Sequence, residues 1–303
     1  MGKIIDIYEV GPRDGFQSVK CRQITTREKL DVIDAMFDAG VHHMEYTSFV
    51  SPKAIPQLAD AKEVTAYVLK KHGDRDLFVL IPNLRGAQTA YELGIKKAAY
   101  VVSMSASHNQ ANINRTHEQS LEAFLEIRNA YPDMEIIVDL STAFGCPFEG
   151  KVRDTEEPTR FLKPYVDAGM KSCCLCDTIG IADPEQVKGI LRSLQKAYPA
   201  LELMVHFHDT RGCGMVNTLT AIGEGITSVQ STLGGLGGCP FAPGASGNLA
   251  TEDLVWMLNE AGYETGISFE KLVRAAKNQA DTIEGLYSGH QISVESNFKS
   301  TAA

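Results

Sequence analysis

Two histidines separated by one residue, His206 and His208 in the stretch HFHD, are the sharpest chemical signal in the sequence. Residues two apart on a β-strand point to the same face, so both imidazoles project to one side and Phe207 to the other. Parallel imidazoles suit a metal ion, although a histidine on a strand can also be satisfied by a backbone carbonyl. The pair therefore indicates a metal site only if further ligands gather beside it.

Arg13 and Asp14, in EVGPRDGFQ, form a charged pair directly after a short apolar run. Gly11 and Pro12 stop that run, and Gly15 follows the pair. A salt-bridged turn would account for such a pair without any chemistry. Other polar residues at or beyond the ends of apolar runs are Glu45, Asp177 and Asn248.

The elements that carry these residues alternate along the chain. Eight short apolar runs read as strands and cover residues 4–10, 42–49, 76–82, 98–104, 134–141, 172–178, 201–209 and 228–235. Between them, apolar residues recur every three or four positions, which predicts helices over 25–40, 120–130, 157–169, 184–198 and 250–262. Strict alternation predicts a parallel sheet, and eight repeats favour a closed (β/α)8 TIM barrel over an open doubly wound sheet.

The chain of 303 residues fits a single α/β domain, because one such barrel typically takes about 250 residues. We expect one domain over 1–303, with the barrel over about 4–263 and a short helical extension over about 264–303. No linker or low-complexity segment interrupts the alternation.

In a TIM barrel the catalytic groups collect at the carboxyl ends of the strands. The residues named above would therefore meet at one mouth, where Asp14, His206, His208 and Asn248 form a set of possible metal ligands. Two nitrogens, a carboxylate and an amide oxygen favour a six-coordinate Mg²⁺ or Mn²⁺ ion, with zinc as the second choice.

Two cysteine-containing stretches allow more than one interpretation. The glycine-rich stretch GGLGGCPFAPGASGN, residues 234–248, either serves tight turns or overhangs the active face, where Cys239 could act as a proton donor. The stretch CCLC, residues 173–176, lacks a second cysteine pair at zinc spacing and is predicted to be a buried strand.

Composition excludes several classes of partner. A formal net charge of −9 gives no basic field for nucleic acid or an anionic membrane. No apolar run approaches the roughly 20 residues that span a bilayer, and the start MGKIIDIYEV lacks a signal-peptide pattern. Seven scattered cysteines argue against a disulfide scaffold. We therefore expect a cytoplasmic protein.

Six motifs along the chain carry a family resemblance. They are GPRDGFQ, EYTSFVSPKAIPQLAD, GCPFEGKV, CDTIGIADP, HFHDTRG and GGLGGCPFAPGASGNLATEDLVWML. Together they resemble the 3-hydroxy-3-methylglutaryl-CoA (HMG-CoA) lyase family, within the superfamily of metal-dependent TIM-barrel lyases and Claisen synthases, over about residues 5–287. The last motif is the most specific, because it carries the cysteine loop.

The resemblance implies a metal-assisted retro-Claisen cleavage of an HMG-CoA-like 3-hydroxyacyl-CoA to acetyl-CoA and a keto acid such as acetoacetate, a step of leucine catabolism and ketone-body formation. The implied ligands of Mg²⁺ or Mn²⁺ are Asp14, His206, His208 and Asn248. Arg13 would stabilise the enolate oxygen, Glu45 would orient Arg13, and Cys239 would protonate the enolate. The base that takes the hydroxyl proton would be His206 or Asp177.

Some residues depart from the pattern of this family. Asp139 and Arg211 are charged where uncharged residues are usual, and Cys174 and Cys176 replace small residues. The stretch 107–115 is shorter and lacks a basic pair. We expect Asp139 and Arg211 to contact each other or the pocket and to contribute to substrate binding.

Three alternatives to this assignment stay open. They are a lyase for another 3-hydroxyacyl-CoA or hydroxy acid, a condensing synthase of the same superfamily, and a binding protein without activity. A homodimer or larger homo-oligomer is also expected.

Overall fold

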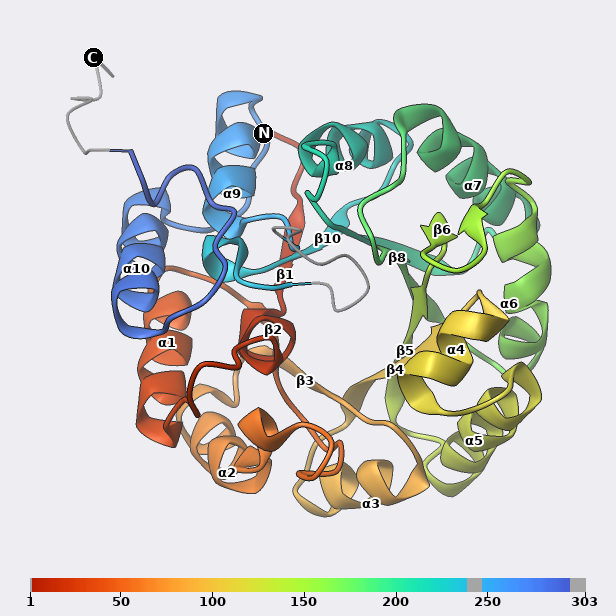
Figure 1. Cartoon of the computed structure of the whole chain (residues 1–303), viewed down its shortest axis with the longest axis horizontal. Coiled ribbons are helices and arrows are strands. Elements are labelled where there is room, and N and C mark those ends of the chain that lie inside the picture. Colours follow the sequence, from red (N-terminus) through yellow and green to blue (C-terminus); the bar gives the residue numbers. More distant parts are fainter. Residues whose placement is uncertain (1, 239–246, 295–303) are drawn as a thin grey trace.

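Eight parallel strands close into a barrel in the computed structural model, which describes residues 2–238 and 247–294 (Figure 1). Around the barrel the strands follow the order β1-β10-β9-β8-β5-β4-β3-β2. The predicted (β/α)8 TIM barrel is therefore confirmed. The strands are β1 (Asp6–Glu9), β2 (His43–Ser48), β3 (Asp76–Leu80), β4 (Lys97–Ser103), β5 (Glu135–Ser141), β8 (Ser172–Asp177), β9 (Glu202–Phe207) and β10 (Ser228–Ser231).

Helices surround the barrel and complete the alternation (Figure 1). They are α1 (Thr26–Asp38), α2 (Ala61–His72), α3 (Leu84–Glu92), α4 (Ala106–Ile113), α5 (His117–Ala130), α6 (Glu157–Asp167), α7 (Pro184–Ala197), α8 (Gly214–Gly223), α9 (Thr251–Glu260) and α10 (Phe269–Thr282). Among the residues described, no helix has both the length and the apolar character needed to cross a membrane.

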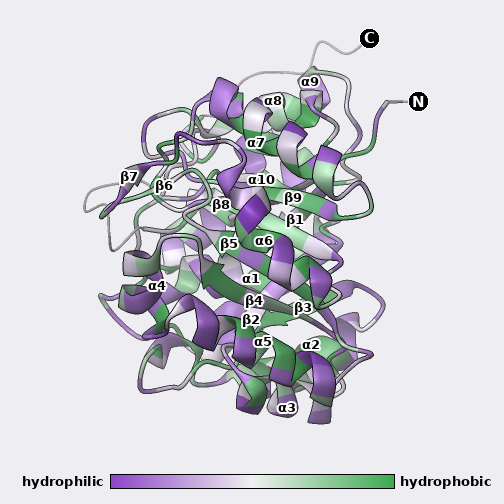
Figure 2. Cartoon of the chain, turned by 90° about the vertical axis from the view of Figure 1, so that its right-hand side faces the viewer, coloured by the Kyte–Doolittle hydropathy of each residue, from purple (hydrophilic) through white to green (hydrophobic). Residues whose placement is uncertain are grey.

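Local signals place the helix starts. Thr25 and Glu28 form a reciprocal capping box at the start of α1, and Asp183 caps α7 while Pro184 occupies its first position. The hydropathy colouring shows mainly apolar strands in the centre and polar residues on the outward sides of the helices (Figure 2).

The apolar residues form two separate clusters, one between strands and helices and one inside the barrel. Strand β8 contributes to both, because Cys173 and Leu175 face the helices while Cys174 and Cys176 face the barrel axis. All four residues are buried, which confirms that CCLC is a buried strand.

Several strand ends differ from the sequence prediction. The strand predicted over 228–235 ends at Ser231, and Leu233–Gly235 form a 3₁₀ turn instead. Gly234 and Gly235 adopt φ values of 70° and 63°, which favour glycine and end the strand. The Arg13–Asp14 pair lies in a single π-helical turn, Gly11–Gly15. A small hairpin of β6 (Gly145–Cys146) and β7 (Gly150–Lys151) was not predicted.

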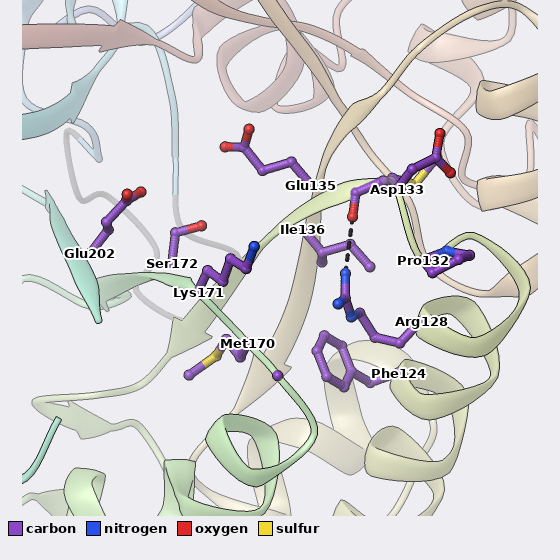
Figure 3. Close-up of a pocket in the computed structure, with 12 residues that line it drawn as sticks. Phe124, Arg128, Pro132, Asp133, Glu135, Ile136, Met170, Lys171, Ser172 and Glu202 are labelled. Atoms are coloured by element: carbon purple, nitrogen blue, oxygen red, sulfur yellow. Dashed lines mark hydrogen bonds between the residues drawn. The ribbon is translucent and has the colours of Figure 1, made fainter. Parts of the chain in front are cut away.

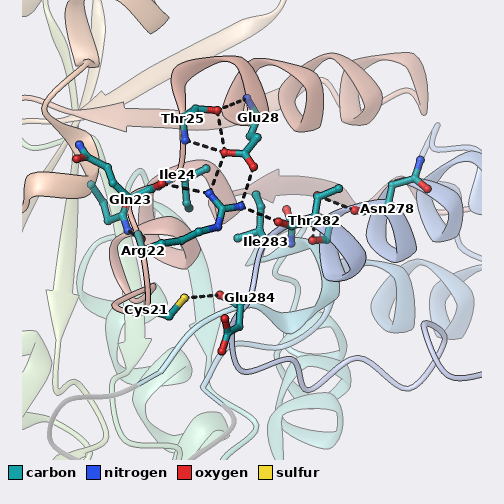
Figure 4. Close-up of polar contacts among 12 residues, drawn as sticks. Cys21, Arg22, Gln23, Ile24, Thr25, Glu28, Asn278, Thr282, Ile283 and Glu284 are labelled. Carbon is teal, nitrogen blue, oxygen red and sulfur yellow. Dashed lines mark hydrogen bonds and ion pairs between the residues drawn. The ribbon is translucent and has the colours of Figure 1, made fainter.

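The predicted helical extension is present as α10, which packs against α1. Arg22 joins the two elements, because its guanidinium binds Glu28 of α1 at 2.7 Å and donates to the carbonyl of Thr282 at 2.7 Å (Figure 4). Beyond α10 the chain returns to the barrel mouth, where the Ser288 hydroxyl donates to the carbonyl of Asn248 at 2.8 Å. The extension thus supports one of the predicted metal ligands.

Two fully buried carboxyl groups hold the turns at this mouth. Glu9 accepts hydrogen bonds from the N–H groups of Gly11 at 2.7 Å and Leu233 at 2.9 Å. Glu252 accepts one from the N–H group of Gly234 at 2.8 Å. Burial raises the pKa of Glu9 to about 7 and that of Glu252 to about 8.

Replacing Glu252 by glutamine should make the protein more stable at pH 8.5 and flatten its stability between pH 5 and pH 8.5. The native state keeps the Glu252 proton up to about pH 8, whereas the unfolded chain loses it near the ordinary value of 4.5. Stability from this group is therefore full at low pH and is lost as pH rises through the folded pKa. In urea unfolding, we expect the free energy of unfolding of the variant to fall by about 1–3 kcal/mol less than that of the wild type over this pH range. Equal losses in the two proteins would contradict the assignment.

Candidate active site

Three of the predicted metal ligands meet at the carboxyl ends of the strands. Asp14 lies in the turn after β1, His206 lies on β9, and His208 follows the last residue of that strand. One candidate ligand atom from each residue lies within 4.8 Å of the others. Since β1 and β9 both pair with β10, barrel closure brings the turn and the two histidines together.

Asn248 joins this group through its backbone and its side chain. Its backbone forms an isolated bridge with His208, and its amide Nδ2 donates to Asp14 Oδ2 at 2.7 Å. The amide oxygen is therefore left for another partner. Gly237 packs so closely on Asn248 that a Cβ atom there would approach the amide nitrogen to 2.5 Å, so glycine is required at this point of the glycine-rich stretch.

The protonation states of these residues fit a divalent cation. Burial by itself would raise the pKa of Asp14, but the charge of Arg13 and the hydrogen bond from Asn248 outweigh it and hold the pKa at about 2. Burial lowers the pKa of His206, and it lowers that of His208 to about 3. An ionised carboxylate and two neutral imidazoles are the forms that bind a metal.

Two buried atoms at this site also lack a hydrogen-bond partner among the described residues. They are Nδ1 of His208 and Oδ1 of Asn248. Buried polar atoms are rarely left unsatisfied, so these two atoms point to a missing ligand. The residues present therefore fit a bound metal ion.

Arg13 is fixed between two carboxylates. Its Nε lies 2.6 Å from Glu45 Oε2, and its guanidinium also contacts Asp14 Oδ1 at 2.6 Å. Burial raises the pKa of Glu45, whereas Arg13 opposes that rise. Arg13 keeps its charge because arginine stays protonated in proteins. The guanidinium is thus held rigidly beside the cation site.

Gln230 is a site residue that sequence analysis missed. Its amide Oε1 lies 3.1 Å from Nδ1 of His206, so Nδ1–H can donate to it and leave Nε2 free for a metal. Gln230 pairs with His206 in the register of β10 and β9. Only the alternation of inward residues on β10 could have indicated it in the sequence.

Comparison with known proteins identifies the family. The family model described as HMGL-like matches residues 4–278, which is most of the chain. The chain belongs to the HMGL-like family. One curated relative is hydroxymethylglutaryl-CoA lyase YngG of Bacillus subtilis, 41% identical over 91% of this chain and 92% of the relative. The human mitochondrial hydroxymethylglutaryl-CoA lyase is 41% identical over 90% of this chain and 84% of its own length.

Solved structures of HMG-CoA lyases agree with this assignment. The lyase of Bacillus subtilis superposes with a TM-score of 0.90 at 39% identity, covering 96% of this chain and 97% of the other. A lyase of Acinetobacter baumannii in complex with coenzyme A and 3-methylmalate also gives a TM-score of 0.90, at 38% identity, covering 98% of this chain and 96% of the other.

Asp177, a candidate base in this HMGL-like chain, binds its own loop. Its carboxylate accepts hydrogen bonds from the N–H groups of Ile181 at 2.9 Å and Ala182 at 3.1 Å. Burial raises the pKa of Asp177 to about 6, although these N–H groups and Arg211 lower it. A carboxylate with this pKa can exchange a proton near neutral pH.

The remaining predicted residues lie in different environments. Arg211 is exposed and donates to the carbonyls of Ile179 at 2.8 Å and Gly180 at 3.0 Å. Asp139 is buried inside the barrel, and burial raises its pKa to about 7 although Arg13 opposes the rise. No ion pair joins Asp139 and Arg211 within the ranges 2–238 and 247–294. Their role in substrate binding stays a prediction. Cys239 lies outside the described residues.

A pocket of about 330 Å³ lies at the opposite end of the barrel (Figure 3). Its lining includes Glu135, Ser172 and Glu202, the first residues of β5, β8 and β9. The amino ends of the strands are far from the side chains that gather at the carboxyl ends. This pocket is therefore separate from the candidate active site.

Proposed function

We propose that this protein is a carbon–carbon lyase that cleaves HMG-CoA, or a closely similar 3-hydroxyacyl-CoA, to acetyl-CoA and a keto acid. The observation that carries the proposal is the cluster of Asp14, His206 and His208 beside the paired Arg13 and Glu45. Two relatives named hydroxymethylglutaryl-CoA lyase and a related lyase in complex with coenzyme A support this substrate class.

The reaction breaks the bond between C2 and C3 of the acyl chain. The C3 hydroxyl loses its proton and becomes the carbonyl of the keto acid, while the electron pair of the broken bond passes to the thioester as an enolate. A proton then joins C2 and completes acetyl-CoA. The site must therefore accept one proton, stabilise one anion and return one proton.

Asp14, His206, His208 and Asn248 would hold the divalent cation. When bound, Mg²⁺ or Mn²⁺ supplies a Lewis acid that polarises substrate oxygens and lowers the pKa of a hydroxyl group. The oxygen and imidazole donors favour these ions over thiophilic metals.

Arg13 would stabilise the thioester enolate. The charge of its guanidinium is confined to a site where Arg13 is 8% exposed and Glu45 is fully buried. In such a site a fixed donor needs no reorganisation as negative charge develops on the substrate. Glu45 would orient Arg13 by holding its Nε, while the second contact to Asp14 links Arg13 to the cation site.

The proton steps fall to three residues. Asp177 would accept the hydroxyl proton, since it is buried at the same barrel mouth and burial raises its pKa to about 6. The alternative base, His206, could accept it only with Nε2 released from the cation, because its Nδ1 donates to Gln230. Cys239 would return a proton to C2.

The six described cysteines are free thiols, which supports a reducing, cytoplasmic compartment. We further propose that the protein forms a homo-oligomer.

The purified protein should cleave HMG-CoA in the presence of Mg²⁺ or Mn²⁺, with acetyl-CoA and acetoacetate appearing in equal amounts by mass spectrometry. A chelator should abolish turnover, and adding either ion back should restore it. Isothermal titration should show one tight site for Mn²⁺, which Asp14→Ala weakens by at least about 100-fold because a charged ligand is lost. No cleavage of any 3-hydroxyacyl-CoA by the metal-loaded protein would overturn the proposal.

A further inference from the structure

A second group of chemically active side chains lies inside the barrel. Asp139 on β5 and Cys174 and Cys176 on β8 bring one oxygen and two sulfur atoms within 4.8 Å of one another. The two sulfur atoms are 4.0 Å apart. The mechanism above uses none of these residues, which we call the Asp139 cluster.

The Asp139 cluster extends deeper into the barrel than the cation site. Asp139 pairs with Cys174, and Cys174 pairs with Met204, which precedes His206 by two residues on β9. Cys176 lies beside His206 in the same register. The cluster thus begins at the level of the metal ligand and continues one layer towards the amino ends of the strands.

Solvent reaches this cluster despite its depth. Cys176 is 9% exposed and Asp139 is 3% exposed, whereas Cys174 is fully buried. The exposed fraction of Cys176 is similar to those of His206 and Arg13, at 7% and 8%, and that of Asp139 is smaller. Cys176 therefore borders the site that His206 and Arg13 line, and Asp139 lies one layer deeper behind it.

Asp139 has an unpaired oxygen atom at this inner end of the site. Its Oδ1 is buried and has no hydrogen-bond partner among the described residues. Burial raises the pKa of Asp139 to about 7. A buried polar atom without a partner is costly, so a bound molecule should supply that partner.

The shape of the substrate indicates what reaches Asp139, and this step rests on the proposed function. The tertiary carbon C3 carries a hydroxyl, a carboxymethyl arm, the thioester arm and one more substituent. The hydroxyl and the carboxylate would face the cation site, and the thioester arm must lead out of the barrel mouth because coenzyme A is too large to enter. The fourth substituent of this tetrahedral carbon then points inward, towards the Asp139 cluster.

We infer that the Asp139 cluster selects a substrate whose fourth C3 substituent carries a hydroxyl group, where HMG-CoA has a methyl group. A hydroxyl can donate to Oδ1 of an ionised Asp139 and accept from a protonated one. A methyl group leaves Oδ1 unpaired, and a carboxylate would meet the repulsion of Asp139, Glu45 and Asp14. The two thiols provide a small, polarisable wall beside this substituent.

The two thiols of this cluster stay protonated unless a metal ion displaces their protons. Burial raises the pKa of Cys174 well above its ordinary value, and that of Cys176 is also raised. Thiols held in the protonated form are poor metal ligands, because the thiolate is the binding form.

The test compares the Mg²⁺-loaded protein on HMG-CoA and on its analogue with hydroxymethyl in place of methyl. Cleavage of the analogue gives acetyl-CoA and 4-hydroxy-3-oxobutanoate. We expect kcat/KM for the analogue to exceed that for HMG-CoA by about tenfold or more, since a site built around a substrate hydroxyl discriminates against its absence. Asp139→Val, which replaces the carboxyl group with an apolar side chain of similar shape, should reverse this preference.

Cys173→Ala is the matched control, because Cys173 lies on the same strand but faces the helices. This variant should keep the wild-type ratio of kcat/KM for the analogue to kcat/KM for HMG-CoA. A binding measurement without turnover completes the test: calorimetric titration should show tighter binding of 4-hydroxy-3-oxobutanoate than of acetoacetate, and Asp139→Val should remove the difference.

The outcomes separate the two proposals. The selectivity inferred here is overturned if the wild type cleaves HMG-CoA at least as well as the analogue and Asp139→Val leaves the ratio of the two kcat/KM values unchanged. That result leaves the lyase proposal standing. A metal-loaded wild type that cleaves neither compound overturns the lyase proposal and the selectivity with it.

Discussion

Replacing Arg13 by glutamine is expected to lower kcat about 10²- to 10³-fold, the range observed when one preorganised donor to a developing anion is removed. Arg13 is the buried cation held by both Glu45 and Asp14, each at 2.6 Å. Glutamine keeps a hydrogen-bond donor but loses the charge that would face the enolate. The measurement is steady-state turnover of the acyl-CoA substrate with saturating Mg²⁺.

Binding of the cation should survive this substitution, because none of the ligand atoms changes. Loss of Arg13 raises the pKa of Asp14, so Mn²⁺ titration should be carried out at pH 8, where the carboxylate is ionised in both proteins. Arg13→Lys serves as the second variant: it keeps the charge but cannot present the planar guanidinium that contacts two carboxylates. If the glutamine variant turns over substrate at the wild-type rate, Arg13 does not stabilise the enolate and serves only to hold the Gly11–Gly15 turn.

Replacing Cys239 by alanine should reduce kcat by about 10²- to 10⁴-fold while leaving the KM for substrate and the affinity for Mn²⁺ nearly unchanged. The expectation follows from the proposed role of this thiol as the donor of the final proton, after the carbon–carbon bond has broken. Rapid-quench analysis should then show that the keto acid forms and that appearance of acetyl-CoA is delayed.

Cys146→Ala provides the comparison for a thiol used in packing. Cys146 is 2% exposed, and its sulfur accepts hydrogen bonds from the N–H groups of Phe148 at 3.3 Å and Glu149 at 3.0 Å. Its loss should lower the melting temperature and leave kcat within about twofold, because only packing and local hydrogen bonds are removed. If Cys239→Ala behaves in the same way as Cys146→Ala, the proton-donor role is wrong.

The architecture could be predicted from the sequence because its signals are local. Apolar runs, helical periodicity and caps such as Thr25 with Glu28 depend on residues close in the chain, and their eightfold alternation leaves few topologies. The spacing of His206 and His208 likewise places both imidazoles on one face wherever the strand lies.

Strand ends and turns were predicted less well. The sequence around Leu233 continues an apolar pattern, but the left-handed conformations of Gly234 and Gly235 end β10 early. At Arg13 and Asp14 the sequence indicates only a stop after β1, whereas the structure has a π-helical turn there, held by Glu9. The backbone conformation of a glycine depends on which buried residue contacts its turn, and the sequence next to the glycine does not show that contact.

By itself the sequence determined the elements, the class of barrel and the types of residue available at its mouth. Only the tertiary structure decided how they are joined: Asn248 donates to Asp14 across 234 residues of chain, and Gln230 fixes one nitrogen of His206. The same is true of Asp139, whose Oδ1 stays unpaired inside the barrel although its strand was predicted correctly. The physical reason is that hydrogen-bond partners and burial are properties of the closed barrel, where strand order and register bring distant residues together, and no local pattern encodes that register.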